Sequence, residues 1–145
     1  MSEDEHFRRL VHMYAQAPIN ATVPSRLEVE AGRAVVTISV EPRLFHAAGS
    51  LHGSIYFKAL DDAAFFAANS VEREGFTLTA RFEVTLLGAV TKGPIRAVGT
   101  LERREGRKAW ASSELFDGHG ELVARGKGLF VTSGSLMNIP SYRDG

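Results

Sequence analysis

The stretch LHGSIYFKALDDAAFFAANS, residues 51–70, contains the one long apolar segment of the chain. Its content of alanine, phenylalanine and leucine, with almost no β-branched residue, favours a helix over a strand. Because this helix is apolar on nearly every side, we expect it to be buried. Two adjacent acidic residues, Asp61 and Asp62, lie within it. A buried carboxylate is unfavourable unless something compensates its charge, so these two residues need a structural or a chemical explanation.

The residues before this segment predict a helix followed by a hairpin. From about residue 2 to 17, apolar residues recur at three- and four-residue steps, as in an amphipathic helix, and Pro18 ends it. These apolar residues are Phe7, Leu10, Val11 and Tyr14. Residues 26–30 and 33–40 then predict two strands, joined by a short turn that contains Gly32.

The residues after it predict four strands. Residues 76–86 alternate between apolar and polar side chains, which predicts one long strand with a single apolar face. The apolar positions are Phe76, Leu78, Ala80, Phe82, Val84 and Leu86. Residues 95–104, 108–116 and 122–132 follow as strands joined by short turns, which predicts an antiparallel meander.

This order of elements predicts an α+β fold in which an antiparallel sheet curls around one long central helix. A chain of 145 residues, 44% of them hydrophobic, has the size and composition of one domain, residues 1–145. We expect its core to span about residues 26–132 and residues 133–145 to form a loose tail.

The charge and composition exclude several kinds of function. Lysine plus arginine equals aspartate plus glutamate at 17 each, so no overall field favours a nucleic acid as partner. The chain has no cysteine and therefore no thiol nucleophile or thiolate metal site, and its five histidines show no zinc-like spacing. The N-terminus lacks a signal-peptide pattern, and charged residues interrupt the apolar segment, so we expect a soluble, cytoplasmic protein that does not enter a membrane.

His52 and Gly53 lie where the predicted loop becomes the buried helix. Unpaired backbone amides at a helix N-terminus favour a nearby negative charge, so this point could hold a developing oxyanion. The alternative is that Gly53 permits a close turn and His52 caps the helix.

A neighbouring lysine could compensate the charge of Asp62 or of Asp61. Lys58 precedes Asp62 by four residues and could pair with it along the helix, and it could also reach Asp61 at three residues. If Asp61 is not paired in this way, it could act as a nucleophile or general base toward an electrophilic carbonyl group.

The spacing of Gly53 and Asp61 limits how they could cooperate. Eight positions along a helix correspond to about 12 Å, so one carbonyl group cannot touch both residues of the same chain. If both act on one substrate, the amide of one subunit must meet the carboxylate of another across a two-fold axis. We therefore expect the active site to require a homodimer.

The segment 51–70 resembles the motif of hot dog thioesterases of the phenylacetic-acid-degradation type, in which HGG is followed by a spaced aspartate and an Asn-Ser pair. The resemblance extends over about residues 30–132, including GELVARGKGLF, which ends at Phe130. It implies hydrolysis of acyl-CoA thioesters without a cofactor, by homodimers that pair into tetramers as dimers of dimers. It also implies that the Gly53 amide polarises the thioester carbonyl, that Asp61 attacks it or activates water, and that Thr79 assists the water.

Two positions depart from the family's motif. Ser54 replaces the second glycine and could add a hydrogen-bond donor, and His46 replaces an asparagine. His46 could donate a hydrogen bond, hold a water molecule or supply a base, or it could be an ordinary loop residue. We expect His46 to take part in catalysis, and His52, Ser54 and Phe57 to contact the substrate.

The acyl group and two alternative functions stay open at this stage. Aromatic residues near the expected site leave aryl and medium-chain acyl groups both possible, although such residues more often belong to a core. They are Tyr56, Phe57, Phe65 and Phe66. A non-catalytic acyl-CoA-binding domain would need an attached DNA-binding module, and one N-terminal helix falls short of a helix-turn-helix. An acyl-thioester hydratase or dehydratase would use a histidine with an acid, which the motif does not display.

Overall fold

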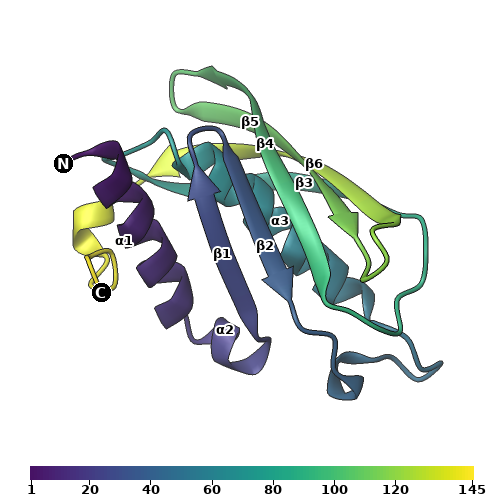
Figure 1. Cartoon of the computed structure of the whole chain (residues 1–145). Coiled ribbons are helices and arrows are strands. Elements are labelled where there is room, and N and C mark those ends of the chain that lie inside the picture. Colours follow the sequence, from purple (N-terminus) through teal and green to yellow (C-terminus); the bar gives the residue numbers. More distant parts are fainter.

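Helix α3 (Gly53–Asn69) lies against one face of a six-stranded antiparallel sheet, as Figure 1 shows for the computed structural model, which describes residues 1–145. The sheet has the order β1-β2-β4-β5-β6-β3. Its strands are β1 (Ser25–Glu30), β2 (Arg33–Ile38), β3 (Phe76–Leu86), β4 (Ile95–Glu105), β5 (Lys108–Phe116) and β6 (Leu122–Ser133). The predicted α+β fold with a sheet around a central helix is therefore confirmed, and β4, β5 and β6 form the predicted meander.

The N-terminal helix covers one edge of the sheet. Helix α1 (Glu3–Gln16) lies beside β1 in Figure 1, and the Ser2 side chain caps its first turn by accepting a hydrogen bond from Glu5. A one-turn helix, α2 (Ile19–Thr22), follows Pro18 and was not predicted. A 3₁₀ turn, η1 (Pro42–Leu44), begins the loop that leads to α3.

The C-terminal segment, residues 133–145, is packed against α1, so the predicted loose tail is wrong. It contains a 3₁₀ turn, η2 (Leu136–Asn138), in which Leu136 is fully buried. The Tyr142 hydroxyl lies 2.5 Å from Nδ1 of His6, which is itself fully buried. The two ends of the chain therefore stabilise each other, a contact between residues too far apart in sequence for local patterns to reveal.

Small residues let α3 lie close to the sheet. Ala59, Ala63 and Ala67 are fully buried on the helix. Gly99 in β4 faces the backbone carbonyl of Ala63 so closely that a Cβ at this position would overlap it. The buried side chains of α3 and of the sheet belong to one hydrophobic core, with a smaller cluster next to it.

Strand β3 contains a β-bulge that the regular alternation of its sequence does not indicate. Its register against β6 shifts between Thr79 and Arg81, which leaves Ala80 as an extra residue. Thr79 faces α3 before the bulge, and Phe82 faces it after the bulge. The predicted single apolar face is therefore interrupted, and Leu78 is 50% exposed.

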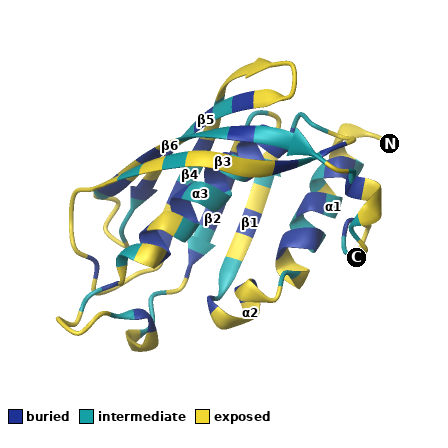
Figure 2. Cartoon of the chain, turned by 180° about the vertical axis from the view of Figure 1, so that it is seen from behind, coloured by how far each residue is buried: buried dark blue, intermediate teal, exposed yellow.

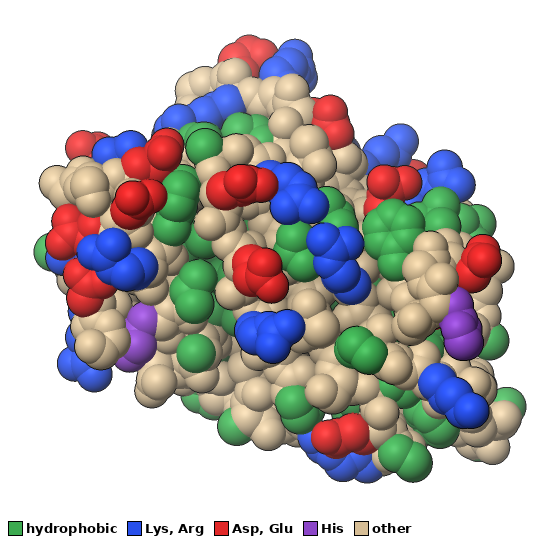
Figure 3. Space-filling model, viewed as in Figure 1, with side chains coloured by type: hydrophobic (Ala, Val, Ile, Leu, Met, Phe, Trp, Pro, Cys, Tyr) green, Lys and Arg blue, Asp and Glu red, His purple; other side chains and the backbone are tan.

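The two outer surfaces of the molecule differ. On the face of the sheet that turns away from α3, acidic and basic side chains are interspersed rather than gathered into a patch of one sign (Figure 3). On the opposite side, β3 runs in front of α3 with many exposed residues (Figure 2). No helix has the length and apolar character needed to cross a membrane.

Candidate active site

One stripe of α3 faces β3. Its residues recur every four positions, which places them on the same side of the helix. The pairs that meet are Gly53 with Leu86, Phe57 with Phe82, Asp61 with Thr79, and Phe65 with Phe76. Asp61 and Thr79 form the polar pair among apolar neighbours, so the carboxylate lies in a surrounding that favours its neutral form.

Asp61 is held by one hydrogen bond. The Thr79 hydroxyl donates to Oδ1 of Asp61 at 2.9 Å. The pKa of Asp61 is raised to about 6, chiefly because burial disfavours the charged form; the Thr79 hydrogen bond and Lys58 oppose this rise, and Asp62 adds to it. A carboxylate with such a pKa is still ionised at neutral pH, yet it accepts a proton more readily than an ordinary aspartate does.

Asp62 belongs to a separate polar cluster on a neighbouring face of the helix. Lys58 Nζ donates to Oδ2 of Asp62 at 2.6 Å, and the Tyr14 hydroxyl donates to the same oxygen at 2.6 Å. Lys58 also donates to Oδ1 of Asn20 at 2.6 Å. Sequence left Lys58 free to pair with either acid, and the structure pairs it with Asp62, which leaves Asp61 without a salt bridge.

The start of α3 offers one free backbone donor. His52 caps the helix, and its Nδ1 accepts a hydrogen bond from the Ser54 amide at 3.0 Å. Nδ1 also lies 2.8 Å from the Ser54 hydroxyl. The Gly53 amide, as the first of the helix, has no intrahelical acceptor, and no hydrogen bond outside the helices and strands comes from it. It is therefore available to a ligand.

A hollow of about 330 Å³ opens in front of this amide. Its lining includes polar groups from the loop before α3 and apolar groups from α3 and the end of β3. Lining residues are His46, Ser50, Leu51, Gly53, Tyr56, Leu86, Gly88 and Ala89. The Tyr56 hydroxyl donates to the Gly88 carbonyl at 2.8 Å. Asp61 does not line this hollow, which agrees with the separation expected from helix geometry.

The buried side chain of Asn69 fixes the beginning of β3. Its Oδ1 accepts hydrogen bonds from the amide and the hydroxyl of Thr77, each at 3.1 Å. Its Nδ2 donates to the Glu72 carbonyl at 2.9 Å and to the Gly75 carbonyl at 3.4 Å. Because Thr79 follows Thr77 by two positions on the same face, this anchor also sets where the Thr79 hydroxyl lies.

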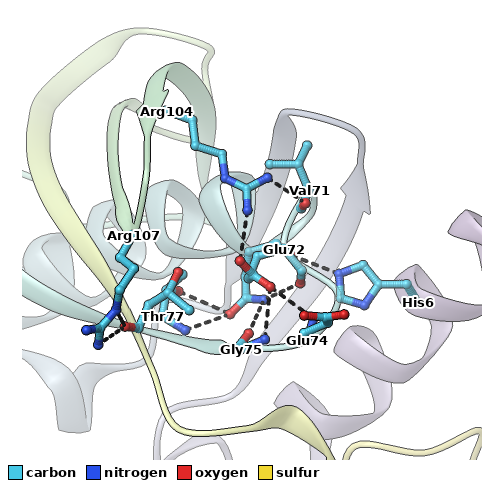
Figure 4. Close-up of polar contacts among 10 residues, drawn as sticks. His6, Val71, Glu72, Glu74, Gly75, Thr77, Arg104 and Arg107 are labelled. Carbon is cyan, nitrogen blue, oxygen red and sulfur yellow. Dashed lines mark hydrogen bonds and ion pairs between the residues drawn. The ribbon is translucent and has the colours of Figure 1, made fainter.

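Charged residues near Asn69 form further contacts around the segment between α3 and β3. Figure 4 shows Glu72, Gly75 and Thr77 converging, with Arg104 and Arg107 reaching toward them. Arg104 pairs with Glu72 at 2.8 Å, and Arg107 donates to the Thr132 carbonyl. These two arginines, which lie at the end of β4 and in the turn to β5, thus both bind groups of the same chain.

The aromatic residues named from sequence divide into core and surface. Tyr56 and Phe66 are buried and Phe65 packs against the core, whereas Phe57 is 42% exposed beside the Asp61–Thr79 pair. No group of three or more histidine, aspartate or glutamate side chains could hold a metal ion. Sequence reasoning gave no polar role to Tyr14 or Asn20, because Tyr14 fits the apolar stripe of α1 and Asn20 follows Pro18 in what reads as a loop.

Comparison with known proteins identifies the family. The model of the family described as the thioesterase superfamily matches residues 48–124. A protein named "Putative esterase" from Sulfurisphaera tokodaii is 32% identical over 104 residues, which cover 71% of this chain and 77% of that protein. The E. coli PaaI protein from the phenylacetic acid degradation operon has the same fold, with a TM-score of 0.80 at 18% identity, covering 90% of this chain and 97% of that chain. A thioesterase family protein from Silicibacter pomeroyi gives a TM-score of 0.79 at 23% identity, covering 90% and 98%. The chain therefore belongs to the thioesterase superfamily and has the hot dog fold of its PaaI-like members.

Proposed function

We propose that this protein hydrolyses acyl-CoA thioesters to a free acid and CoA. The observation that carries the proposal is the pair of groups on α3: a half-buried Asp61 carboxylate, bonded to Thr79 and with its pKa raised to about 6, and a Gly53 amide at the helix start that is free to donate. The first group suits a nucleophile or general base, and the second suits an oxyanion donor.

The proposed reaction uses both groups on one carbonyl. Either the Asp61 carboxylate attacks the thioester carbon to form an anhydride that water then cleaves, or it takes a proton from a water molecule that attacks the same carbon. In both routes negative charge develops on the carbonyl oxygen, where the Gly53 amide stabilises it. The C–S bond then breaks, CoA leaves as its thiolate and takes up a proton, and no cofactor takes part.

The proposed site is shared between two copies of the chain. Gly53 and Asp61 are about 12 Å apart along one helix, and the hollow in front of Gly53 excludes Asp61. A two-fold axis that brings the α3 helices of two copies together in antiparallel fashion would give each carbonyl one Gly53 amide and one Asp61 carboxylate.

The surface that the second copy would cover is available. Strand β3 ends the sheet, so the backbone groups along its outer edge have no strand partner, which makes it a template for pairing with another chain. Large apolar side chains are exposed on and beside this strand. They are Phe57 (42%), Leu78 (50%), Leu86 (54%) and Leu87 (49%). We propose a homodimer through this surface, and tetramers that pair such dimers.

The acyl group in this proposal is aryl or medium-chain. Leu51, Tyr56 and Leu86 supply apolar walls to the 330 Å³ hollow, and the Tyr56 hydroxyl is already bonded to Gly88. Phe57 is exposed one helical turn before Asp61 and can contact an apolar group.

A panel of acyl-CoAs, scored by release of free thiol, tests the activity. We expect wild-type protein to release thiol from aryl- or medium-chain substrates and Asp61→Asn to abolish release while the fold stays intact. The matched variant Asp62→Asn should retain most of the turnover, because Asp62 is bonded to Lys58 and Tyr14 rather than facing the site. Binding of acyl-CoA without thiol release would instead favour a non-catalytic domain.

Mixed dimers test whether the site is shared. Gly53→Pro removes the amide donor at a position that accepts proline, because proline fits the first turn of a helix and His52 before it is extended (φ −65°, ψ 141°). Gly53→Ala is the matched control: it keeps the amide, and its Cβ would meet only Leu86, at an ordinary 3.7 Å. Gly53→Pro and Asp61→Asn should each be inactive alone.

After the two inactive chains are mixed and reassembled, one site of the hybrid dimer carries both defects and the other carries neither. Activity should return to as much as half of the wild-type value per hybrid dimer. Well-folded hybrids that are as inactive as their parents would contradict the shared site.

A further inference from the structure

The loop before α3 is held as a tight, fixed turn. Phe45 and Leu51 form an antiparallel bridge across it, and the His46 amide donates to the Ser50 carbonyl at 2.9 Å. Gly49 turns the chain with a φ of +86°, and its amide donates back to the His46 carbonyl at 3.0 Å. The side chains of His46 and Ser50 therefore face each other from a defined backbone.

Both ring nitrogens of His46 are engaged within this loop. The Ala48 amide donates to Nδ1 at 3.0 Å, so Nδ1 carries a lone pair and the hydrogen of the neutral ring is on Nε2. Nε2 lies 2.9 Å from Oγ of Ser50 and donates to it. His46 therefore keeps no free acceptor nitrogen with which to take a proton from water.

This arrangement leaves the Ser50 hydroxyl hydrogen free. Ser50 Oγ accepts from His46, and its own hydrogen has no acceptor among the hydrogen bonds of the chain. Ser50 lines the same hollow as Gly53, where the other hydroxyl, that of Tyr56, already donates to Gly88. The Ser50 hydroxyl and the Gly53 amide are thus both left to donate to a ligand in this hollow.

We propose that the Ser50 hydroxyl is a second donor to the carbonyl oxygen of the thioester, beside the Gly53 amide, and that His46 is the positioning residue that aims it. This inference rests on the proposed thioester hydrolysis and adds a catalytic residue to it. No proton is transferred: the hydroxyl donates a hydrogen bond that strengthens as negative charge develops on the oxygen. Of the roles that the sequence leaves open for His46, this proposal assigns a hydrogen bond that acts through Ser50 and not a role as base.

Kinetics of serine variants test the first part. Ser50→Ala should lower kcat roughly 10- to 100-fold with a smaller change in KM, since the lost bond matters most in the transition state. Ser50→Thr keeps the hydroxyl and should retain most of the activity. Ser112→Ala is the matched control, because this hydroxyl is bonded to Glu102 far from the hollow.

A double-mutant cycle tests the role of His46. His46→Ala should lower kcat in the wild-type background and have little further effect once Ser50 is alanine, because His46 acts through that hydroxyl. His46→Asn, which retains a side-chain donor, should keep more activity than His46→Ala. Independent, additive losses would overturn the relay.

Asp61→Asn, assayed in parallel, separates the two proposals. If Asp61→Asn is inactive while Ser50→Ala stays within twofold of wild type, the role of Ser50 is wrong and the proposed function stands. If Asp61→Asn keeps near-normal turnover, the assignment of the acid fails whatever Ser50→Ala does. If the wild type releases no thiol, both proposals are wrong.

Discussion

Asp61→Asn should make the protein more stable at pH 8 while it removes activity. The pKa of Asp61 in the folded chain is about 6, chiefly because of burial, against an ordinary value of 3.8. A difference of about two pKa units corresponds to about 3 kcal/mol by which the ionised carboxylate weakens the folded state at pH 8. Asparagine has the same shape, carries no charge and can still accept the Thr79 hydrogen bond, so it should avoid most of this penalty.

The pH dependence has a definite sign. A carboxyl group whose folded pKa is raised contributes stability that is fully present below about pH 3.8 and is lost as the pH rises through about 6. The advantage of Asp61→Asn should therefore grow between pH 4 and pH 7, from under about 1 kcal/mol at pH 4 to as much as about 3 kcal/mol at pH 8.

Urea unfolding followed by circular dichroism, at pH 4 and pH 8 and at one protein concentration, measures this difference. Asp62→Asn is the control: it breaks the ion pair with partly buried Lys58 and should be less stable than wild type at pH 8. If Asp61→Asn is no more stable than wild type at pH 8, or gains equally at both pH values, the carboxylate does not have the raised pKa on which the proposed chemistry depends.

Three further predictions concern the same elements. The kcat/KM for hydrolysis should rise with pH through about 6, with about a tenth of its plateau value at pH 5, because Asp61 must be ionised. Thr79→Val removes a hydrogen bond that lowers the pKa of Asp61, so it should move the midpoint of the pH–rate profile upward. An unmoved midpoint would contradict the assignment of Asp61. Asn69→Ala should lower the free energy of unfolding by about 2–4 kcal/mol, since it leaves the buried amide and hydroxyl of Thr77 without an acceptor, and urea unfolding showing a loss under about 1 kcal/mol would refute this anchor. Gly99→Ala should lower the melting temperature, with a loss of about 1–3 kcal/mol, because the new methyl group overlaps the backbone of α3; an unchanged melting curve would show that the helix can move away.

Much of the fold could be predicted because local chemistry specifies it. The turn between β1 and β2 contains Gly32 and the turn between β4 and β5 contains Gly106, each with a positive φ that suits glycine. The helix-favouring composition of residues 53–69 and the positions of Asp61 and Asp62 within it can also be read from the sequence. The rise of the helix alone predicts that Gly53 and Asp61 lie about 12 Å apart. In agreement with this distance, Asp61 does not line the hollow in front of Gly53.

The remaining features depend on contacts that sequence patterns do not encode. Lys58 could reach either acid, and only the position of α1, which brings Tyr14 beside Asp62, shows which one it meets. The composition of the C-terminal segment predicts a loose tail. The segment is packed nonetheless, because Tyr142 contacts the buried His6, which lies 136 residues earlier in the sequence. The engagement of both His46 nitrogens likewise depends on a turn whose shape the residue types do not reveal.

The bulge at Ala80 shifts the register of β3 against β6 by one residue between the two halves of the strand. A ladder without the bulge would turn Leu78 inward and carry the Thr79 hydroxyl to the opposite face, since a slip of one residue reverses every side chain. The hydrophobic pattern of the strand alone would favour that slipped pairing. The hydrogen bonds from the amide and the hydroxyl of Thr77 to Asn69 oppose it. Whether a hot dog chain presents a hydroxyl to its acid is thus decided by strand pairing as well as by the residue at that position. Two relatives could share the same threonine in an alignment and still differ in chemistry.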